Sequence, residues 1–207
     1  MLTAIGIGPD GKRSVLGCSV QLSEAEPHWR KFLESLLKRG MHGLRLVVSD
    51  DHSGLRAARQ ATLAGVPWQR CQFHTIRNAM AHVTKVAVRS EIARDLGRVF
   101  DADEPAEAER RLKDIVARYQ KTAPQLGAWR EQAVPEALAV LNIPASHRRR
   151  LRTTNGLERL NKEIKRRTRV ATLFPNEASL LRLASAVPSE ISDDWETERA
   201  YLNMEAR

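Results

Sequence analysis

Cysteine is scarce in this sequence, where only Cys18 and Cys71 occur among 207 residues. Two cysteines cannot build the disulfide framework of a small secreted domain, so their scarcity favours a reducing, cytoplasmic location. Long apolar runs are also lacking, and none reaches the ~18–20 residues that span a bilayer. The N-terminal stretch does not resemble a signal peptide, because Pro9, Asp10 and Gly11 interrupt its apolar residues early. The sequence therefore predicts neither a membrane span nor a secretory leader.

Glycine-rich phosphate loops are missing as well, since neither a Walker motif nor G-x-G-x-x-G is present. Internal repeats and low-complexity tracts are also missing. Aromatic residues make up only 5% of the chain, and its most basic stretch lacks the Trp/Phe-rich apolar face of a membrane-surface helix. Hydrophobic residues make up 42% of the whole chain. That content is enough for one compact domain, or for one domain carrying an insertion.

Positive charge is concentrated in residues 145–170. The formal net charge of the chain is +9, and this window alone contributes +8, from ten lysines and arginines against Glu158 and Glu163. A basic stretch of this kind indicates a polyanionic partner, with DNA or RNA as the first candidate. The basic side chains are Arg148, Arg149, Arg150, Arg152, Arg159, Lys162, Lys165, Arg166, Arg167 and Arg169.

Residues 1–74 have an α/β pattern. The runs LTAIGI and SVLGCSV flank GPDGKR, a turn sequence that predicts a β-hairpin. A helix follows and ends at Gly40, and the apolar run LRLVVSD then predicts a buried strand. After it come a helix near Ser53 and a short strand, PWQRC.

Residues 75–150 instead carry helical periodicity, punctuated by Pro105, Pro124 and Pro135. A further helix is predicted from Asn155, and two more on either side of Pro188. The most economical interpretation is an α/β domain, formed by residues 1–74 and 151–207, that an all-helical insertion at 75–150 interrupts.

Asp50 is the first candidate site residue. Asp50 follows the predicted buried strand, at the edge of an open α/β sheet where catalytic groups collect. Alternation sends the side chains of Asp50 and Asp51 in opposite directions, so only one is expected to face a site. The alternative is that Asp50 caps the helix starting near Ser53.

Glu158 also has two interpretations. Asn155 and Glu158 have the spacing of a capping box, in which the glutamate reaches back to the first turn of its helix. However, Glu158, Lys162, Lys165 and Arg169 also share one helical face, a basic track headed by an acid. Such a face fits basic side chains on a phosphodiester backbone and a carboxylate holding a metal ion at one phosphate. The two roles are compatible.

Cys71 and His74 form a C-x2-H pair. A closed zinc site needs four ligands, and no second pair lies at a finger-like distance. Nothing marks an oxyanion hole or a third orienting group for a Cys-His nucleophile. We therefore favour a packed cysteine with a hydrogen-bonded histidine over zinc binding or nucleophilic catalysis.

Four blocks of the sequence resemble the Mutator-type transposases of bacterial insertion sequences. The blocks are LVVSDDHSGLRAA, PWQRCQFHTIRNAM, RTTNGLERLNKEIKRRTRVATLFPNEASLLRLASAV and DDWETERAYLNM. They occur in the family's order over nearly the whole chain. The resemblance implies a ribonuclease H-like mixed sheet interrupted by a helical insertion.

The resemblance also implies a DDE site, in which three carboxylates hold Mg²⁺ or Mn²⁺ for DNA strand cleavage and transfer. Its second aspartate matches Asp50 and its glutamate matches Glu158, 108 positions later. Cys71 and His74 match the family's C-x2-H signature. The implied partners are DNA, both element ends and target, and further copies of the full-length enzyme.

Two features depart from the family pattern. The strand bearing the first catalytic aspartate would precede residue 1, and Asp10 cannot replace that aspartate because it lies in the turn. Arg148 stands where relatives have an aromatic residue. We therefore expect a sheet lacking its first strand, weak metal binding and an inactive fragment of a transposase. The alternatives are a non-catalytic DNA-binding remnant that modulates full-length transposase, and a related metal-dependent nuclease.

Overall fold

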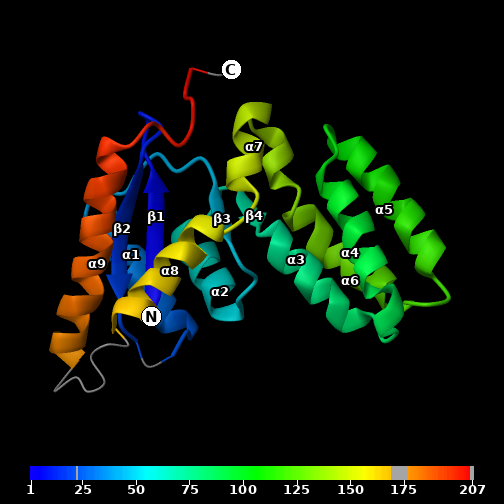
Figure 1. Cartoon of the computed structure of the whole chain (residues 1–207), viewed down its shortest axis with the longest axis horizontal. Coiled ribbons are helices and arrows are strands. Elements are labelled where there is room, and N and C mark those ends of the chain that lie inside the picture. The colour runs from blue at the N-terminus through cyan, green and yellow to red at the C-terminus, as the bar shows by residue number, and fades with distance from the viewer. Residues whose placement is uncertain (22, 169–176, 206–207) are drawn as a thin grey trace. The chain divides into compact units, whose positions relative to one another are not determined.

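The computed structural model describes residues 1–21, 23–168 and 177–205 of the chain. It is a mixed α/β structure, mostly helical, with small sheets (Figure 1). The chain divides into two compact units. Unit 1 comprises residues 1–45, 52–66 and 154–207, and unit 2 comprises residues 46–51 and 67–153. Within the described ranges, no helix combines the length and apolarity needed to cross a bilayer.

Unit 1 begins with the predicted hairpin. Strands β1 (Leu2–Ile7) and β2 (Arg13–Ser19) pair antiparallel, with a register shift between Ala4 and Ile5. Gly11 in the turn has φ +77°, the positive value that the turn sequence predicts for glycine. A Cβ at this position would meet the Leu202 carbonyl oxygen at 2.0 Å. The hairpin prediction is confirmed.

Two helices of unit 1 pack on each other. Helix α1 (Glu26–Lys38) buries Phe32, Leu33 and Leu36, and helix α2 (Ser53–Thr62) lies against it. The contact needs a glycine, because a Cβ on Gly54 would come within 2.4 Å of the Glu24 carbonyl oxygen.

The last two helices of unit 1 are α8 (Asn155–Thr168) and α9 (Glu177–Thr197), which contact each other and the hairpin. Leu160 and Ile164 of α8 join Val187 of α9 in a small buried cluster, against which Ile5 and Val15 of the hairpin pack. The apolar face read from the α8 sequence is therefore the buried face.

Pro188 does not separate two helices, so that prediction is wrong. Helix α9 runs through Pro188, which is buried inside it. Proline lacks an N–H and forfeits one helical hydrogen bond, a cost of roughly 3 kcal/mol relative to alanine. Packing of α9 on β2 and α8 keeps the helix continuous despite that cost.

Unit 2 contains the other two strands. Strands β3 (Val47–Ser49) and β4 (Trp68–Arg70) pair parallel and are shorter than expected. In the described residues the four strands form two separate pairs, β1–β2 and β3–β4. The sequence predicted a mixed sheet that lacks its first strand, and no described strand pairs with both β1 and β3.

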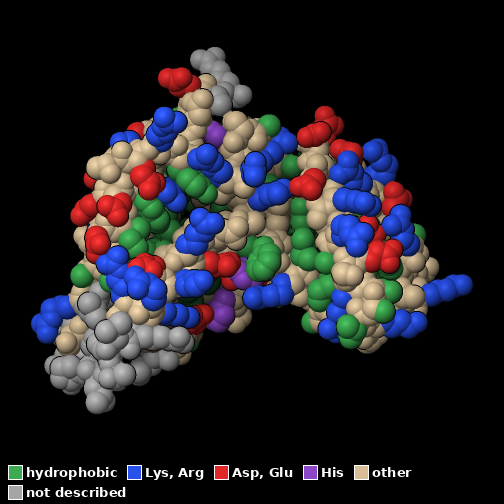
Figure 2. Space-filling view, viewed as in Figure 1, with side chains coloured by type: hydrophobic (Ala, Val, Ile, Leu, Met, Phe, Trp, Pro, Cys, Tyr) green, Lys and Arg blue, Asp and Glu red, His purple; other side chains and the backbone are tan. Residues whose placement is uncertain are grey.

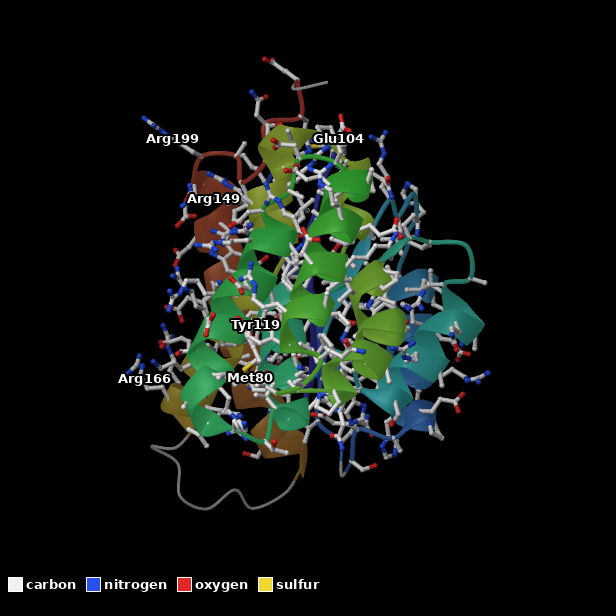
Figure 3. The ribbon with its side chains drawn as sticks, turned by 90° about the vertical axis from the view of Figure 1, so that its right-hand side faces the viewer. Met80, Glu104, Tyr119, Arg149, Arg166 and Arg199 are labelled. Atoms are coloured by element: carbon white, nitrogen blue, oxygen red, sulfur yellow. The ribbon has the colours of Figure 1, made fainter. Side chains whose placement is uncertain are left out.

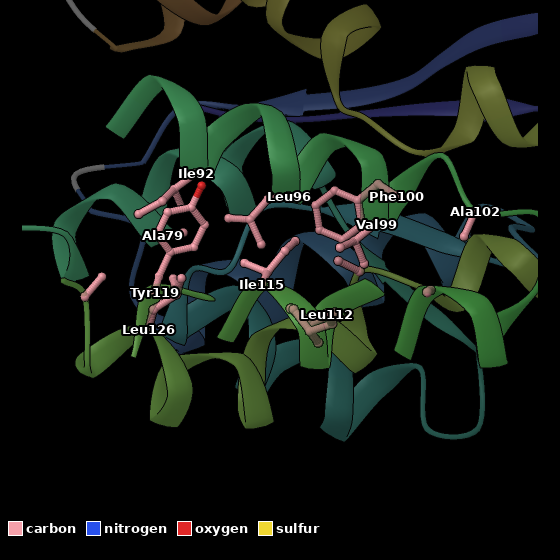
Figure 4. Close-up of a cluster of buried hydrophobic side chains, with 14 of the residues drawn as sticks. Ala79, Ile92, Leu96, Val99, Phe100, Ala102, Leu112, Ile115, Tyr119 and Leu126 are labelled. Carbon is pink, nitrogen blue, oxygen red and sulfur yellow. The ribbon is translucent and has the colours of Figure 1, made fainter. Parts of the chain in front are cut away.

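The remainder of unit 2 is helical, as the periodicity predicts. Its elements are α3 (Gln72–Ala79), η1 (Met80–His82), α4 (Val86–Phe100), α5 (Pro105–Tyr119), α6 (Gln125–Glu136), η2 (Ala139–Asn142) and α7 (Ala145–Leu151). The apolar faces of these elements up to η2 meet in one core that includes Ile92, Leu96, Val99, Ile115 and Leu126 (Figure 4). This core gives the helices a packed centre of their own.

A polar group is buried at the edge of that core. Asp95 is 5% exposed and accepts hydrogen bonds from Arg118 and Tyr119, both at 2.9 Å. Burial and the bond to Asp95 raise the pKa of Tyr119. Tyr119 lies among the helices, whereas Arg166 of α8 projects from the surface (Figure 3). The Asp95 network joins α4 to α5.

Candidate active site and nucleic-acid interface

Asp50 lies immediately after β3, at the carboxyl end of the strand. Its Oδ1 is 2.5 Å from Nδ1 of His74, and 47% of its side chain is exposed. His74, by contrast, is almost completely buried. A buried imidazole that holds one carboxylate oxygen orients the group and leaves the rest of it accessible to solvent.

Local backbone contacts place Cys71 and His74 beside Asp50. Cys71 follows β4 and extends the strand pairing, because its N–H donates to the Ser49 carbonyl at 2.8 Å. Its own carbonyl accepts from the N–H and the hydroxyl of Thr75, which lies in α3. His74 lies three residues after Cys71, in the first turn of α3. The expected packed cysteine is present, since Cys71 is fully buried.

Asp51 points to different partners. Arg70 of β4, whose side chain is 6% exposed, contacts Asp51 at 3.0 Å and Glu136 of α6 at 3.6 Å. Asp50 and Asp51 thus diverge as strand alternation predicts. Asp51 serves as a counter-ion to a buried arginine, a structural role.

Asp50 does not occupy the capping position of the next helix. The residue before α2 is His52, which makes no side-chain capping bond. The alternative role for Asp50 as the N-cap of that helix is therefore wrong. The helix starts one residue after His52, too far along the chain for Asp50 to be its N-cap.

Glu158 lies in the first turn of α8 and is exposed. Asn155 is the first helical residue, so Thr154 rather than Asn155 precedes the helix. The Thr154 hydroxyl donates to Glu158 Oε1 at 3.1 Å. This geometry differs from the predicted capping box, because the shift of one residue moves Glu158 beyond the position that reaches the capping amide.

A hollow of about 560 Å³ follows α8, lined by Glu158, Asn161, Lys162, Lys165 and Arg166. One acid and three basic side chains therefore face the same space from a single helix. Blue Lys and Arg side chains are visible along α8 in Figure 2. The basic track headed by an acid, read from the sequence as one helical face, is thus a concave surface in unit 1. A surface of this charge and shape fits a phosphodiester backbone.

The C-terminal turn of α8 has another role. Glu163 accepts from both Arg166, at 2.7 Å, and Arg167, at 2.8 Å. Arg167 also contacts Glu190 of α9 at 2.5 Å. The hydrogen bonds from Arg166 and Arg167 lower the pKa of Glu163 to about 2. Arg167 therefore links α8 to α9.

The arginines before residue 154 belong to unit 2, on or next to α7. Arg148 donates to the carbonyls of Leu141, Ile143 and Asp103, which makes it a structural connector. Arg152 pairs with Asp101 at 2.7 Å.

The remaining basic residues are Arg149, Arg150 and Arg159, which are exposed, and Arg169, which lies outside the described residues. The basic residues of the 145–170 window therefore divide between the two units, and several of them hold the fold together.

Sequence reasoning missed Asn161 and Arg70. Asn161 lines the hollow beside Glu158 and accepts a 2.8 Å hydrogen bond from the Thr3 hydroxyl. The spacing of three residues between Glu158 and Asn161 is the signal that places both on one helical face. Arg70 carries no such signal, because only the fold brings it to Asp51.

Asp50 and Glu158 are each the kind of ligand that magnesium prefers. Asp50 and Glu158 both offer carboxylate oxygen at solvent-accessible positions. Mg²⁺ prefers oxygen ligands, takes only one or two protein carboxylates and keeps several waters. Each of the two carboxylates, Asp50 in unit 2 and Glu158 in unit 1, therefore has by itself the chemistry of an Mg²⁺ ligand.

Comparison with known proteins defines the class of the chain. The family model described as "Transposase, Mutator family" matches residues 1–198. The transposase for insertion sequence element IS406 of Burkholderia multivorans is 54% identical over 204 residues, covering 99% of this chain and 53% of the relative. The transposase for ISRM5 of Rhizobium meliloti is 37% identical, covering 99% and 51%. The transposase for IS256 in transposon Tn4001 of Staphylococcus aureus is 35% identical, covering 98% and 52%.

The class is therefore that of transposases. The chain belongs to the Mutator family of transposases, as the match over residues 1–198 shows, and the resemblance read from the four sequence blocks is confirmed. The chain spans about half the length of the curated relatives it matches.

Proposed function

We propose that this chain provides catalytic residues of an insertion-sequence transposase that cleaves and joins DNA with Mg²⁺ or Mn²⁺. Asp50 and Glu158 are the second and third carboxylates of its DDE site. The observation that carries this proposal is the hollow along α8, in which Glu158 shares one surface with Lys162 and Lys165. Family membership supports the same chemistry.

The proposed architecture is ribonuclease H-like. An antiparallel hairpin followed by a parallel strand pair, with Asp50 at the end of β3, is compatible with that fold. The helical core that includes Ile92 and Leu126 supports an insertion over residues 75–150. We propose that residues 1–74 and 151–207 form the catalytic domain.

Each residue has a distinct role in this proposal. Lys162 and Lys165 bind the phosphodiester backbone, and Asn161 is held by Thr3 at the same surface. His74 keeps the Asp50 carboxylate in one rotamer. When bound, divalent ions supply Lewis-acid stabilisation of the reacting phosphate and its attacking oxygen.

The proposed partners are DNA and further copies of the full-length transposase, in the bacterial cytoplasm. Binding to DNA should be governed by charge. Each phosphate contact contributes about −0.9 to the slope of log K against log salt.

Replacing Lys162 and Lys165 together with alanine should therefore make that slope shallower by about 2, without altering sequence preference. Fluorescence anisotropy with a labelled duplex between low and physiological salt measures the slope. Lys113→Ala is the matched control, since Lys113 is an exposed lysine on α5. An unchanged slope in the double variant would remove the assignment of this surface to DNA.

The alternative functions give different outcomes in the same preparation. A non-catalytic DNA-binding remnant retains the salt-dependent binding but does not need Glu158 for any reaction. A metal-dependent nuclease cuts DNA in a Glu158-dependent way but joins no ends.

A further inference from the structure

The cluster beside β3 contains more than an oriented carboxylate. One carboxylate oxygen of Asp50, the Cys71 Sγ and a ring nitrogen of His74 all lie within 4.8 Å of one another. Oxygen, sulfur and nitrogen donors thus converge on one point of unit 2. The three donors come from the ends of β3 and β4 and from the first turn of α3.

We propose that Asp50, Cys71 and His74 bind one divalent cation of borderline softness, Zn²⁺ or Co²⁺. This site goes beyond the proposed function, in which Asp50 belongs to a magnesium site built from oxygen ligands. The donor set decides the metal class. Thiolate and imidazole select zinc-like ions, whereas Mg²⁺ binds neither well.

The spacing of the donors suits such an ion. Bonds of about 2.0–2.3 Å to a tetrahedral centre place the ligand atoms roughly 3–4 Å apart. Asp50 Oδ1 and His74 Nδ1 lie closer than this, at 2.5 Å, a hydrogen-bond distance. A cation bound to both atoms therefore requires Asp50 to turn slightly away from the ring.

Burial divides the site into a fixed part and an accessible part. Cys71 is fully buried and His74 is 6% exposed, so the two softer ligands are held in place by packing and by the Ser49 and Thr75 hydrogen bonds. Asp50 is half exposed and gives the ion a path from solvent.

Three protein ligands leave one coordination position for water. This is the pattern of open zinc sites, since closed structural sites have four protein ligands. Binding converts the Cys71 thiol to a thiolate, with its proton released to solvent.

Cobalt is a direct probe of the sulfur ligand. Titrating the reduced full chain with Co²⁺ alone should produce a sulfur-to-cobalt charge-transfer band in the near ultraviolet that saturates at one equivalent. Cys71→Ser should abolish the band, and Cys18→Ser, the matched control, should retain it. A band that survives in Cys71→Ser, or no band in wild-type protein, would overturn the proposal.

A second variant guards against misfolding of Cys71→Ser. Asp50→Asn changes a half-exposed side chain and should keep the band while weakening Co²⁺ affinity on the order of tenfold or more. Even the loss of a side chain that only hydrogen-bonds to a metal ligand lowers metal affinity by about that factor. Unchanged affinity in Asp50→Asn would reject Asp50 as a ligand and thereby overturn the site as proposed. Neither assay uses DNA, and the salt-slope assay on α8 does not involve Cys71. The metal site and the proposed function therefore fail separately.

Discussion

Two neighbouring aspartates differ at the residue scale in what surrounds them. Asp50 is half exposed and contacts His74, whereas Asp51 contacts Arg70, whose side chain is 6% exposed. An acid beside a buried arginine is needed for stability, because an unpaired buried charge is costly. An acid in the open mouth of a site is available for binding.

We therefore expect Asp51→Ala to lower the free energy of unfolding by about 1–3 kcal/mol, the cost of a poorly satisfied buried charge. Glu136 remains near Arg70 and limits the loss. Asp50→Ala should cost less than about 1 kcal/mol, as is usual for an exposed ionic contact. Urea unfolding followed by tryptophan fluorescence measures both variants. Equal destabilisation by the two alanines would contradict the division of roles.

Helix α8 serves two purposes at the element scale. Its N-terminal and middle turns carry Glu158, Lys162 and Lys165 along the hollow, while Glu163 and Arg167 link the helix to α9 through Glu190. Charge on one helix is therefore divided between the proposed binding surface and a structural contact. A count of basic residues in the sequence does not separate these uses.

The structural contact should show in the pH dependence of stability. The pKa of Glu163 falls from an ordinary 4.5 to about 2 in the folded chain. A depressed carboxyl pKa contributes stability that is complete above the unfolded value and disappears as the pH falls through the folded value. Glu163→Gln should thus be less stable than wild type at neutral pH, and the difference should vanish between about pH 4.5 and pH 2.

Thermal unfolding across that pH range measures the difference. The effect should be small, since all these side chains contact solvent. Glu109→Gln, which removes an exposed pair with Lys113 at i,i+4, is the matched control. A stability difference between Glu163→Gln and wild type that persists unchanged below pH 2 would mean that Glu163 acts through something other than its charge.

At the scale of the whole molecule, the proposed DDE site requires three carboxylates. Within the described ranges, Asp51 is committed to Arg70, and Asp10 accepts the Lys12 amide in the hairpin turn at 3.0 Å. Neither is a good substitute for the first acid of a DDE site. Two-metal catalysis needs a carboxylate that bridges both ions.

We expect the polypeptide of residues 1–207 to yield no strand-transfer product from a pre-cut DNA end with Mg²⁺ or Mn²⁺. Gel analysis of end-labelled DNA measures product. Product that disappears in Glu158→Gln but persists in Glu163→Gln would show that another acid of this chain completes the site. Asp51 would then be the first residue to test.

The sequence alone determined the family, the hairpin and most helices, and it singled out Asp50, Glu158, Cys71 and His74 as candidate site residues. These features depend on local patterns: turn chemistry around Gly11, apolar periodicity, and motifs of fixed spacing. Local patterns are readable because neighbouring residues along a chain remain neighbours in any fold. The match over residues 1–198 agrees with that reading at the level of family.

Tertiary structure alone decided which residues contact one another across the chain. Pro188 remains inside α9 because packing on β2 offsets a local penalty, and Asp51 differs from Asp50 because Arg70, distant in sequence, lies beside only one of them. Arg148 is a structural residue because three carbonyls converge on it. Such contacts join residues far apart in the chain. Their energies depend on burial and geometry, which a one-dimensional pattern does not encode.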